Sequence, residues 1–273
     1  MNEPTLRIGR ALDGKLVTLQ FDHGRANEMG SAQITELEAL AAALYADPVA
    51  VALVSFSRRV SSKGNPIFVA GANVTERAAW DHERTKAHVT WQRAVLQQVR
   101  RLPLFHIAIV NGVALGWGTE WLLTADWRIA TPGAVFGLPE TGLGILPGAG
   151  GSAELWHHVG VPQALRLGMT GERIGADEAH RIGLVQEVLP DVDAGLKRAH
   201  ELAERVSRNS PTAVAAFKGV VLAAVGSPYA ERTNLEAKAY ASCVDSGDAD
   251  IGRAGFSVIS QGGNVQWGPR RAR

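Results

Sequence analysis

This chain of 273 residues has a single cysteine, Cys243, and almost no net charge. One cysteine cannot form an intrachain disulfide framework, and such scarcity is typical of a reducing compartment. Lys and Arg number 28 against 27 Asp and Glu, which gives a formal charge of +1. A balance this even provides no basic field for nucleic acid or an anionic membrane surface.

Long apolar runs and several common site motifs are missing as well. The longest apolar stretch, residues 107–130, contains Glu120, Asp126 and Arg128 and therefore does not predict a transmembrane helix. No GxSxG elbow is present, which argues against a serine acyl-hydrolase. The histidines are scattered or adjacent rather than spaced as metal ligands. We expect a cytoplasmic protein without a metal site.

Alternating strands and helices are predicted for the first half of the chain. Residues 16–21, 49–56, 66–70 and 105–110 are apolar and rich in β-branched residues, as buried strands are. A long helical stretch is expected over about residues 75–101. This pattern predicts an α/β core over residues 1–190. From 191 to 273 the pattern is helical, and its open apolar faces predict an oligomerisation region. We also expect this region to cover the active site.

The first segment that suggests chemistry, residues 110–123, joins a buried strand to a helix through a glycine-rich turn. The first N–H groups of a helix have no internal partner and carry partial positive charge, which favours an anion or a developing oxyanion. Glu120 lies in that first turn, between Trp117 and Trp121. Two interpretations stay open: Glu120 stabilises its own helix start, or it is a buried carboxyl with a role in proton transfer.

The second segment, residues 136–152, places Glu140 directly after a proline and among apolar residues and glycines. A glutamate in these surroundings is paired, exposed or held for proton transfer. The glycines nearby match neither GxGxxG nor a Walker loop. A third segment, residues 68–74, is a strand that ends in small residues whose N–H groups could supply an oxyanion donor. Glu120 and Glu140 form a candidate acid/base pair.

Together, in this order, the three segments resemble the crotonase (enoyl-CoA hydratase/isomerase) superfamily. The family's AGAD-type turn, GxALGGGCE-type loop and FGxPExxLGxxPGxGG segment correspond to Ala70-Gly-Ala-Asn73, Gly112-Val-Ala-Leu-Gly-Trp-Gly-Thr-Glu120 and residues 136–151. The likeness covers roughly residues 16–190. It implies an α/β fold, a spiral of ββα units with a C-terminal helical trimerisation region. It also implies a homotrimer or a hexamer built as a dimer of trimers.

The resemblance further implies roles for individual residues. The substrate would be an acyl-CoA thioester whose carbonyl oxygen accepts hydrogen bonds from the backbone N–H groups of Ala72 and Trp117. Glu120 would deprotonate the attacking water and Glu140 would protonate the α-carbon, in the reversible hydration of a 2-enoyl-CoA to a 3-hydroxyacyl-CoA. Coenzyme A enters as part of the substrate, and no other cofactor is implied. The remaining substrate-binding or CoA-binding positions are Arg25, Ala26, Ala70, Gly71, Asn73, Val74, Gly116 and Gly148.

Some positions depart from the usual family pattern. Trp117 stands where glycine is usual, so we expect its indole beside the acyl or pantetheine channel, and Asn73 replaces an aspartate. The usual C-terminal ending is absent, and one hypothesis is that Arg270, Arg271 and Arg273 contact the CoA phosphates instead. These departures keep other readings open: double-bond isomerisation, decarboxylation, C–C bond formation, or a non-catalytic acyl-CoA-binding oligomer.

Overall fold

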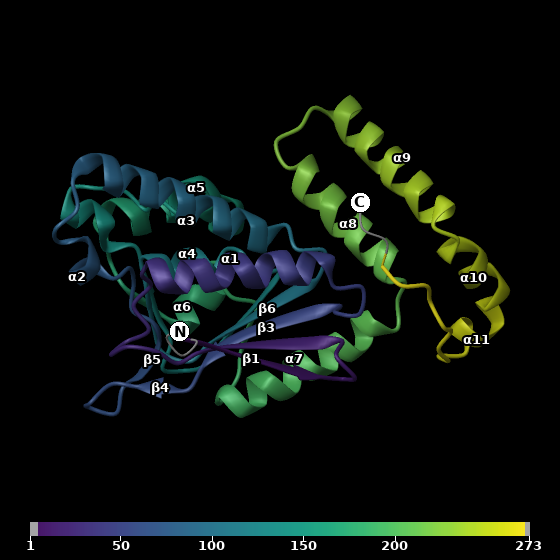
Figure 1. Cartoon of the computed structure of the whole chain (residues 1–273), viewed down its shortest axis with the longest axis horizontal. Coiled ribbons are helices and arrows are strands. Elements are labelled where there is room, and N and C mark those ends of the chain that lie inside the picture. The colour runs from purple at the N-terminus through teal and green to yellow at the C-terminus, as the bar shows by residue number, and fades with distance from the viewer. Residues whose placement is uncertain (1–4, 271–273) are drawn as a thin grey trace.

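Two β-sheets form the body of the protein, as the computed structural model, which describes residues 5–270, shows (Figure 1). The larger sheet has the strand order β1-β2-β3-β6-β8-β11, and only β1 and β2 pair antiparallel. The smaller sheet has the order β10-β9-β7-β5-β4, and its central three strands are parallel. The strands are β1 (Leu6–Ala11), β2 (Leu16–Phe21), β3 (Ala52–Ser57), β4 (Arg59–Val60), β5 (Pro66–Val69), β6 (Phe105–Val110), β7 (Val113–Leu115), β8 (Trp127–Ala130), β9 (Val135–Gly137), β10 (Ile174–Gly175) and β11 (Glu187–Val188).

Helices provide the crossovers that parallel strands require. A parallel connection needs a dozen or more residues, and α1 supplies it between β2 and β3 while α3 precedes β6. Every residue of β3 is buried, because helices cover both faces of the larger sheet. The helices of the body are α1 (Ser31–Ala46), α2 (Val74–Arg77), α3 (His82–Arg100), α4 (Trp117–Leu122), the 3₁₀ helix η1 (Pro139–Leu143), α5 (Gly151–Thr170), α6 (Ala176–Arg181) and α7 (Val192–Ser207).

The long helix expected over residues 75–101 is two helices. The single turn α2 ends at Arg77, and α3 begins at His82. Asp81 caps α3, because its side chain accepts a hydrogen bond from the N–H of Arg84 at 2.7 Å. The apolar periodicity of the sequence is carried by α3 alone, and the break leaves α2 free to follow the turn after β5.

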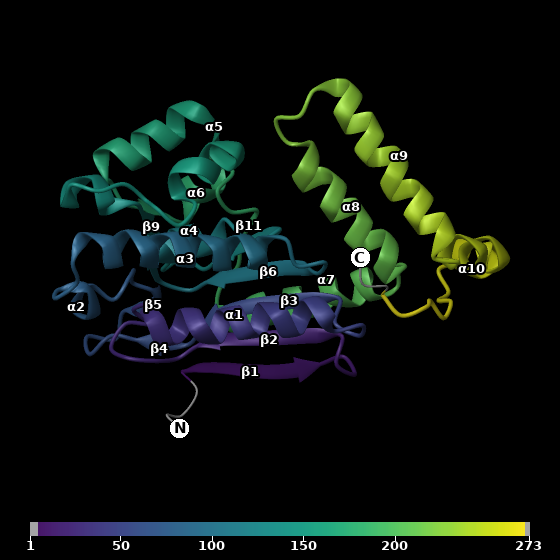
Figure 2. The same cartoon turned by 45° about the horizontal axis from the view of Figure 1, so that its top comes forward.

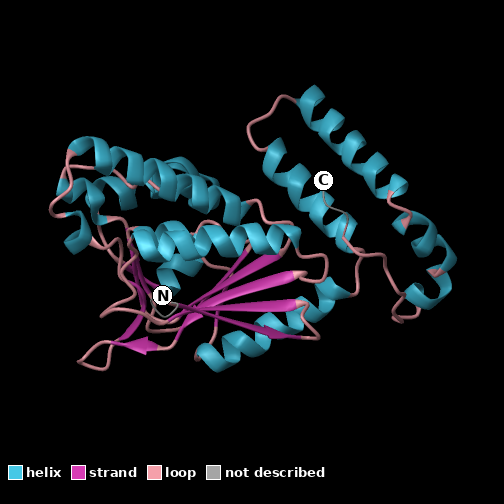
Figure 3. Cartoon of the chain, in the orientation of Figure 1, coloured by secondary structure: helices cyan, strands magenta, loops and turns pink. Residues whose placement is uncertain are grey.

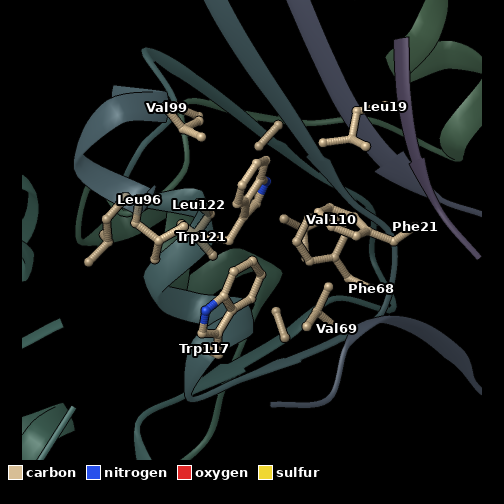
Figure 4. Close-up of a cluster of buried hydrophobic side chains, with 14 of the residues drawn as sticks. Leu19, Phe21, Phe68, Val69, Leu96, Val99, Val110, Trp117, Trp121 and Leu122 are labelled. Atoms are coloured by element: carbon tan, nitrogen blue, oxygen red, sulfur yellow. The ribbon is translucent and has the colours of Figure 1, made fainter. Parts of the chain in front are cut away.

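Aromatic side chains fill the centre of the body (Figure 4). Trp117 and Trp121 stack with their ring centroids 5.5 Å apart, and the edge of Phe21 packs against both. The indole N–H of Trp121 donates to Ser55 Oγ at 2.9 Å, so its polar atom is satisfied inside the core. This cluster joins α4 to the larger sheet and fixes the position of that short helix.

Beyond Asp191 the chain is helical, as predicted (Figure 3). The helix α7 packs on the larger sheet, with Ala199 and Ala203 fully buried. The remaining helices are α8 (Pro211–Ala224), α9 (Tyr229–Asp245), α10 (Asp248–Ala254) and α11 (Phe256–Ser260). Figure 2 shows α8 and α9 packed side by side and extending away from the body. None of the helices described between residues 5 and 270 has the length and hydropathy needed to cross a membrane.

Candidate active site

Three neighbouring strand ends bring the predicted site residues together. The strands β5, β7 and β9 are parallel and adjacent, so their carboxyl ends meet at one edge of the smaller sheet. Ala72 follows β5, Trp117 and Glu120 follow β7 at the start of α4, and Glu140 follows β9 in η1. The sheet topology therefore places two carboxyls and two candidate amide donors on adjacent turns.

Glu120 lies in the first turn of α4 and is only 3% exposed. Its Oε1 accepts hydrogen bonds from the backbone N–H groups of Ala149 (2.7 Å) and Gly151 (2.9 Å). Its Oε2 accepts none from residues 5–270. Burial raises the pKa of Glu120 to about 7; the two N–H donors oppose this shift, and the charge of Glu140 adds to it. A carboxyl with this pKa exchanges a proton readily near neutral pH.

Glu140 reaches the same region from η1. A Cβ atom on Gly116 would overlap Glu140 Oε1, so this carboxyl packs directly against the backbone that precedes α4. Gly116 also has a φ of +50°, which an L side chain rarely adopts. Glu140 Oε2 is buried and has no hydrogen-bond partner among residues 5–270. Burial raises the pKa of Glu140, which favours its protonated form.

The turn after β5 presents the N–H of Ala72. Met29 holds this turn from the side: its N–H donates to Gly71 O at 2.9 Å, and its carbonyl accepts from the N–H of Asn73 at 2.8 Å. The carbonyl of Gly71 and the N–H of Asn73 thus have hydrogen-bond partners, whereas the N–H of Ala72 donates to no backbone acceptor within residues 5–270. The turn therefore holds the N–H of Ala72 in a fixed position and leaves it free to donate to a ligand.

Trp117 supplies the second amide as the first residue of α4. An N–H at this position has no partner inside its own helix. A Cβ atom on Gly118 would overlap the carbonyl oxygen of Val69, so α4 begins in direct contact with the end of β5. Because of this contact, the amides of Trp117 and Ala72 lie on touching segments. Two backbone donors without acceptors among residues 5–270, one of them at the N-terminus of α4, have the chemistry of an oxyanion hole.

Comparison with known proteins identifies the family. The model of the enoyl-CoA hydratase/isomerase family matches residues 16–259. The chain belongs to this family, the crotonase superfamily. Membership supports an enzyme that acts on an acyl-CoA thioester, and it confirms the family resemblance seen in the sequence.

Relatives and solved structures agree with this placement. Short-chain-enoyl-CoA hydratase from Clostridium acetobutylicum is 31% identical over 237 residues, which are 86% of this chain and 88% of that protein. 2,3-Dehydroadipyl-CoA hydratase from Escherichia coli K12 is 42% identical over 151 residues, 55% of this chain and 58% of that protein. The crystal structure of an enoyl-CoA hydratase from Bacillus anthracis matches with a TM-score of 0.87 at 31% identity and covers 96% of this chain and 98% of that one. The predicted α/β crotonase fold is thereby confirmed.

In this crotonase fold, the loop that follows β2 and contains Arg25, Ala26 and Asn27, here called the early loop, lies against the Ala72 turn. The carbonyl of Ala26 accepts a hydrogen bond from the N–H of Ala70 at 3.1 Å, next to Gly71. The backbone carbonyl of Arg25 is held by Arg59 Nε at 3.3 Å. The structure thus brings the predicted CoA-binding residues of both segments together, and their contact with CoA stays a prediction.

The other predicted positions border the same turns. Asn73 caps α2, because its Oδ1 accepts from the N–H of Glu76 at 3.1 Å, so the cap does not need the charge of an aspartate. Val74 is exposed. The carbonyl of Gly148 accepts a hydrogen bond from Arg93 Nε at 2.7 Å, one residue before the amide that holds Glu120.

The indole of Trp117 differs from the expectation for a channel residue. It is 2% exposed and lies in the aromatic core cluster, stacked on Trp121 (Figure 4). Neither indole lines the two cavities beside Glu120 and η1. The backbone of Trp117 therefore belongs to the candidate site, while its side chain contributes to packing.

Arg270 does not provide the CoA phosphate contact that was hypothesised from the sequence. Its side chain is 7% exposed and donates only to backbone carbonyl groups. These are the carbonyls of Leu44, Tyr45, Asp47, Ala50 and Pro103. A guanidinium used in this way fastens the C-terminal segment to the body. Arg271 and Arg273 lie outside the described residues.

Sequence reasoning did not identify Asn27 as a residue that supports the site. Asn27 is fully buried at a φ of +56°, and its Nδ2 donates to Phe68 O at 2.7 Å and to Ser57 Oγ at 3.1 Å. Its Oδ1 accepts from the N–H of His23 at 2.9 Å. These bonds tie the early loop to the end of β5, just before the Ala72 turn. The available signal was an asparagine, which tolerates positive φ, within the Arg25-Ala26-Asn27 loop.

One cavity adjoins Glu120, a second lies beside η1, and a third lies elsewhere. The first, about 240 Å³, is lined by Glu120, Leu96 and Ala149, and the second, an apolar one of about 430 Å³, by Leu138, Leu155 and neighbours from α5. The third, about 560 Å³, lies between the body and α8 and shares no residue with the candidate site. We assign the site by its converging polar groups, because acid/base chemistry needs those groups and not volume alone. Among the described residues 191–270, none lines the cavity beside Glu120 or the one beside η1.

Proposed function

We propose that this enzyme catalyses the reversible hydration of a 2-enoyl-CoA to a 3-hydroxyacyl-CoA. The observation that carries the proposal is the pair Glu120 and Glu140, two carboxyls with raised pKa on adjacent strand-end turns beside two amides that lack acceptors. Relatives named as hydratases support the same reaction. Coenzyme A enters as part of the substrate, and the proposed step uses only carboxyls and backbone amides.

In the forward direction, the thioester carbonyl oxygen accepts hydrogen bonds from the N–H groups of Ala72 and Trp117. Ionised Glu120 takes a proton from water, and the water oxygen bonds to the β-carbon. The C=C electron pair moves toward the thioester and forms an enolate, which the two amides stabilise. Protonated Glu140 then gives its proton to the α-carbon. Removal of one such donor costs about 3 kcal/mol of transition-state stabilisation in comparable sites.

The surroundings of each carboxyl raise its pKa, so both can exchange a proton in this step. Glu120, with a pKa of about 7, becomes ionised as the pH rises through neutrality. Glu140 has a buried oxygen without a partner, and burial favours its neutral form. The charge of Glu140 raises the pKa of Glu120 further, so the proton on Glu120 depends on the charge of its neighbour. In the proposed step Glu120 gains a proton and Glu140 loses one, and proton transfer through water restores both carboxyls.

We also propose that the subunits assemble as a homotrimer or as a dimer of trimers. Large apolar side chains on the helical region are exposed in the single chain, among them Phe217 (74%), Tyr229 (75%), Tyr240 (73%) and Phe256 (70%). Burial of these side chains between subunits would remove them from water. Native mass spectrometry of the purified protein should show three or six chains; a monomer at micromolar concentration would contradict this proposal.

The hydration is tested with crotonyl-CoA in ordinary and oxygen-18 water, followed by mass spectrometry. We expect a mass gain of one water that carries the label, and a loss of at least about 100-fold in rate for Glu120→Gln and for Glu140→Gln. Glu204→Gln, an exposed glutamate on α7, is the matched control and should retain the wild-type rate.

Other outcomes separate the alternatives. Movement of the double bond in a β,γ-unsaturated thioester without a mass gain would replace hydration by isomerisation. Tight binding of saturated acyl-CoA, with no turnover of any unsaturated thioester, would show a non-catalytic binding protein. Full activity in both glutamine variants would refute the assignment of the carboxyl pair.

A further inference from the structure

Arg77 lies one helical turn beyond the Ala72 amide. The single turn α2 starts directly after this turn, at the cap Asn73, and lies beside the beginning of α3 (Figure 1). Its two charged residues point in different directions. Glu76 accepts a hydrogen bond from the N–H of Ser31 on α1 at 2.9 Å, whereas the guanidinium of Arg77 donates to Gln92 Oε1 on α3 at 2.9 Å.

The partner of Arg77, Gln92, lies on the buried face of α3 one turn before Leu96, which lines the same cavity as Glu120. Gln92 is 4% exposed, and the next residue, Arg93, donates to the carbonyl of Gly148 at 2.7 Å. The N–H of Ala149 then holds Glu120 Oε1 at 2.7 Å. Burial lowers the pKa of Arg77, and the negative charges of Glu76 and then Glu120 oppose this, so Glu120 lies within electrostatic range of Arg77. Arg77 therefore lies near Glu120, on the helical turn that follows the Ala72 amide.

The guanidinium of Arg77 has unused hydrogen-bonding capacity. No carboxylate within residues 5–270 forms an ion pair with it, and its Nε is buried without an acceptor. On the same buried face of α3 as Gln92, His88 Nε2 is also buried without a partner. The guanidinium of Arg77 also lies 6.0 Å from the centre of the Trp80 ring. A guanidinium has five donors in a planar fork that matches a carboxylate, and a partly buried cation without an anion is costly unless a ligand supplies one.

We propose that Arg77 binds a carboxylate carried by the acyl group of the substrate, so that the enzyme prefers 2-enoyl-CoA thioesters with a second acid group. This inference rests on the proposed function and names the substrate class of that same site. The thioester oxygen lies at the Ala72 amide, and Arg77 extends from the next turn of the same segment. The carboxylate at the far end of a short acyl chain forms the ion pair that the protein itself leaves unmade.

The test compares two substrates that differ only in the terminal group: trans-2-hexenedioyl-CoA and trans-2-hexenoyl-CoA. Wild-type enzyme should show the higher kcat/KM for the diacid. Arg77→Gln should lower the ratio of the two kcat/KM values by about 10- to 100-fold, since it removes a charge-assisted pair. The matched control is Arg84→Gln, because Arg84 also packs over Trp80 (4.7 Å) but is exposed on α3, and its ratio should not change.

An unchanged ratio of the two kcat/KM values in Arg77→Gln would overturn the proposal. If both values fall equally, Arg77 acts on Glu120, the CoA moiety or folding instead. Saturated adipyl-CoA and hexanoyl-CoA report binding without turnover, so calorimetry separates this inference from the proposed hydration. Wild-type protein should bind adipyl-CoA at least about 10-fold more tightly. Equal affinities would refute the role of Arg77 even if hydration is confirmed, and tighter adipyl-CoA binding would support it even without hydration. If Arg77→Gln does not fold, the affinities of the wild-type protein for adipyl-CoA and hexanoyl-CoA decide whether the site prefers a diacid.

Discussion

Glu120→Gln should inactivate the enzyme and, above neutral pH, make it more stable. The carboxyl has a pKa of about 7 in the folded protein against an ordinary value of 4.5. Between these values the folded protein binds more protons at this site than the unfolded chain does, so stability falls as the pH rises through that window. The destabilisation is about 1 kcal/mol at pH 5 and about 3 kcal/mol at pH 8, an upper estimate for a buried group.

The substitution removes this destabilisation while it keeps the contacts of the carboxyl. The amide oxygen of the new side chain can still accept from the N–H groups of Ala149 and Gly151, which now hold Glu120 Oε1. We expect the variant to gain stability relative to wild type by about 2 kcal/mol more at pH 8 than at pH 5. A gain in stability together with lost turnover is typical of a residue retained for chemistry.

The assay is urea denaturation of wild type, Glu120→Gln and the exposed control Glu204→Gln, at one protein concentration and at both pH values. The control should show no difference between the two pH values beyond that of wild type. An equal effect of Glu120→Gln at pH 5 and pH 8, or a variant less stable than wild type at pH 8, would refute the buried, proton-binding character of Glu120.

Further substitutions test how the site and the helical region are held. Gly118→Ala should lower the hydration rate at least about 100-fold, because its Cβ pushes the start of α4 away from Val69 O; an unchanged rate in a folded variant would show that this contact does not position the amides. Lys218→Met should cost about 3 kcal/mol in urea denaturation, since Lys218 Nζ pairs with Asp126 at 2.6 Å in a largely buried contact, and a second change, Asp126→Asn, should recover most of that loss. Arg270→Met should cost about 2 kcal/mol through its lost backbone contacts, measured by thermal unfolding, whereas wild-type stability would show that the C-terminal segment is not fastened.

Local patterns in the sequence predicted the buried strands and the candidate acid/base pair. The apolar runs that became β3 and β6 are recognisable because parallel strands covered on both faces have little polar alternation. Glu120 and Glu140 stood out because a carboxyl among apolar residues and glycines is unusual. That Glu120 and Glu140 lie at the same edge of one sheet depends on the strand order, which local sequence patterns do not reveal.

Side-chain direction and long-range contacts were less predictable. The helical periodicity through residues 75–101 concealed a break that the cap Asp81 makes, and this break isolates Arg77 on its own turn. Arg270 was a candidate for a CoA phosphate contact because the usual family ending is absent, but the chain returns to the body and buries Arg270 on backbone carbonyls. Neither outcome follows from neighbouring residues, since each depends on segments far away in the sequence.

The sequence by itself determined the family, the succession of elements and the residue types available for chemistry, because these follow from residue identity and spacing. Only the tertiary structure decided which groups converge at the candidate site. The strand order set the two carboxyls beside the amides, and packing turned the indole of Trp117 into the core while its N–H stayed at the turn. Packing also placed the guanidinium of Arg77 near Glu120 without an ion-pair partner among residues 5–270. Burial and the sharing of hydrogen bonds are properties of the assembled chain, so they arise only when distant segments come into contact.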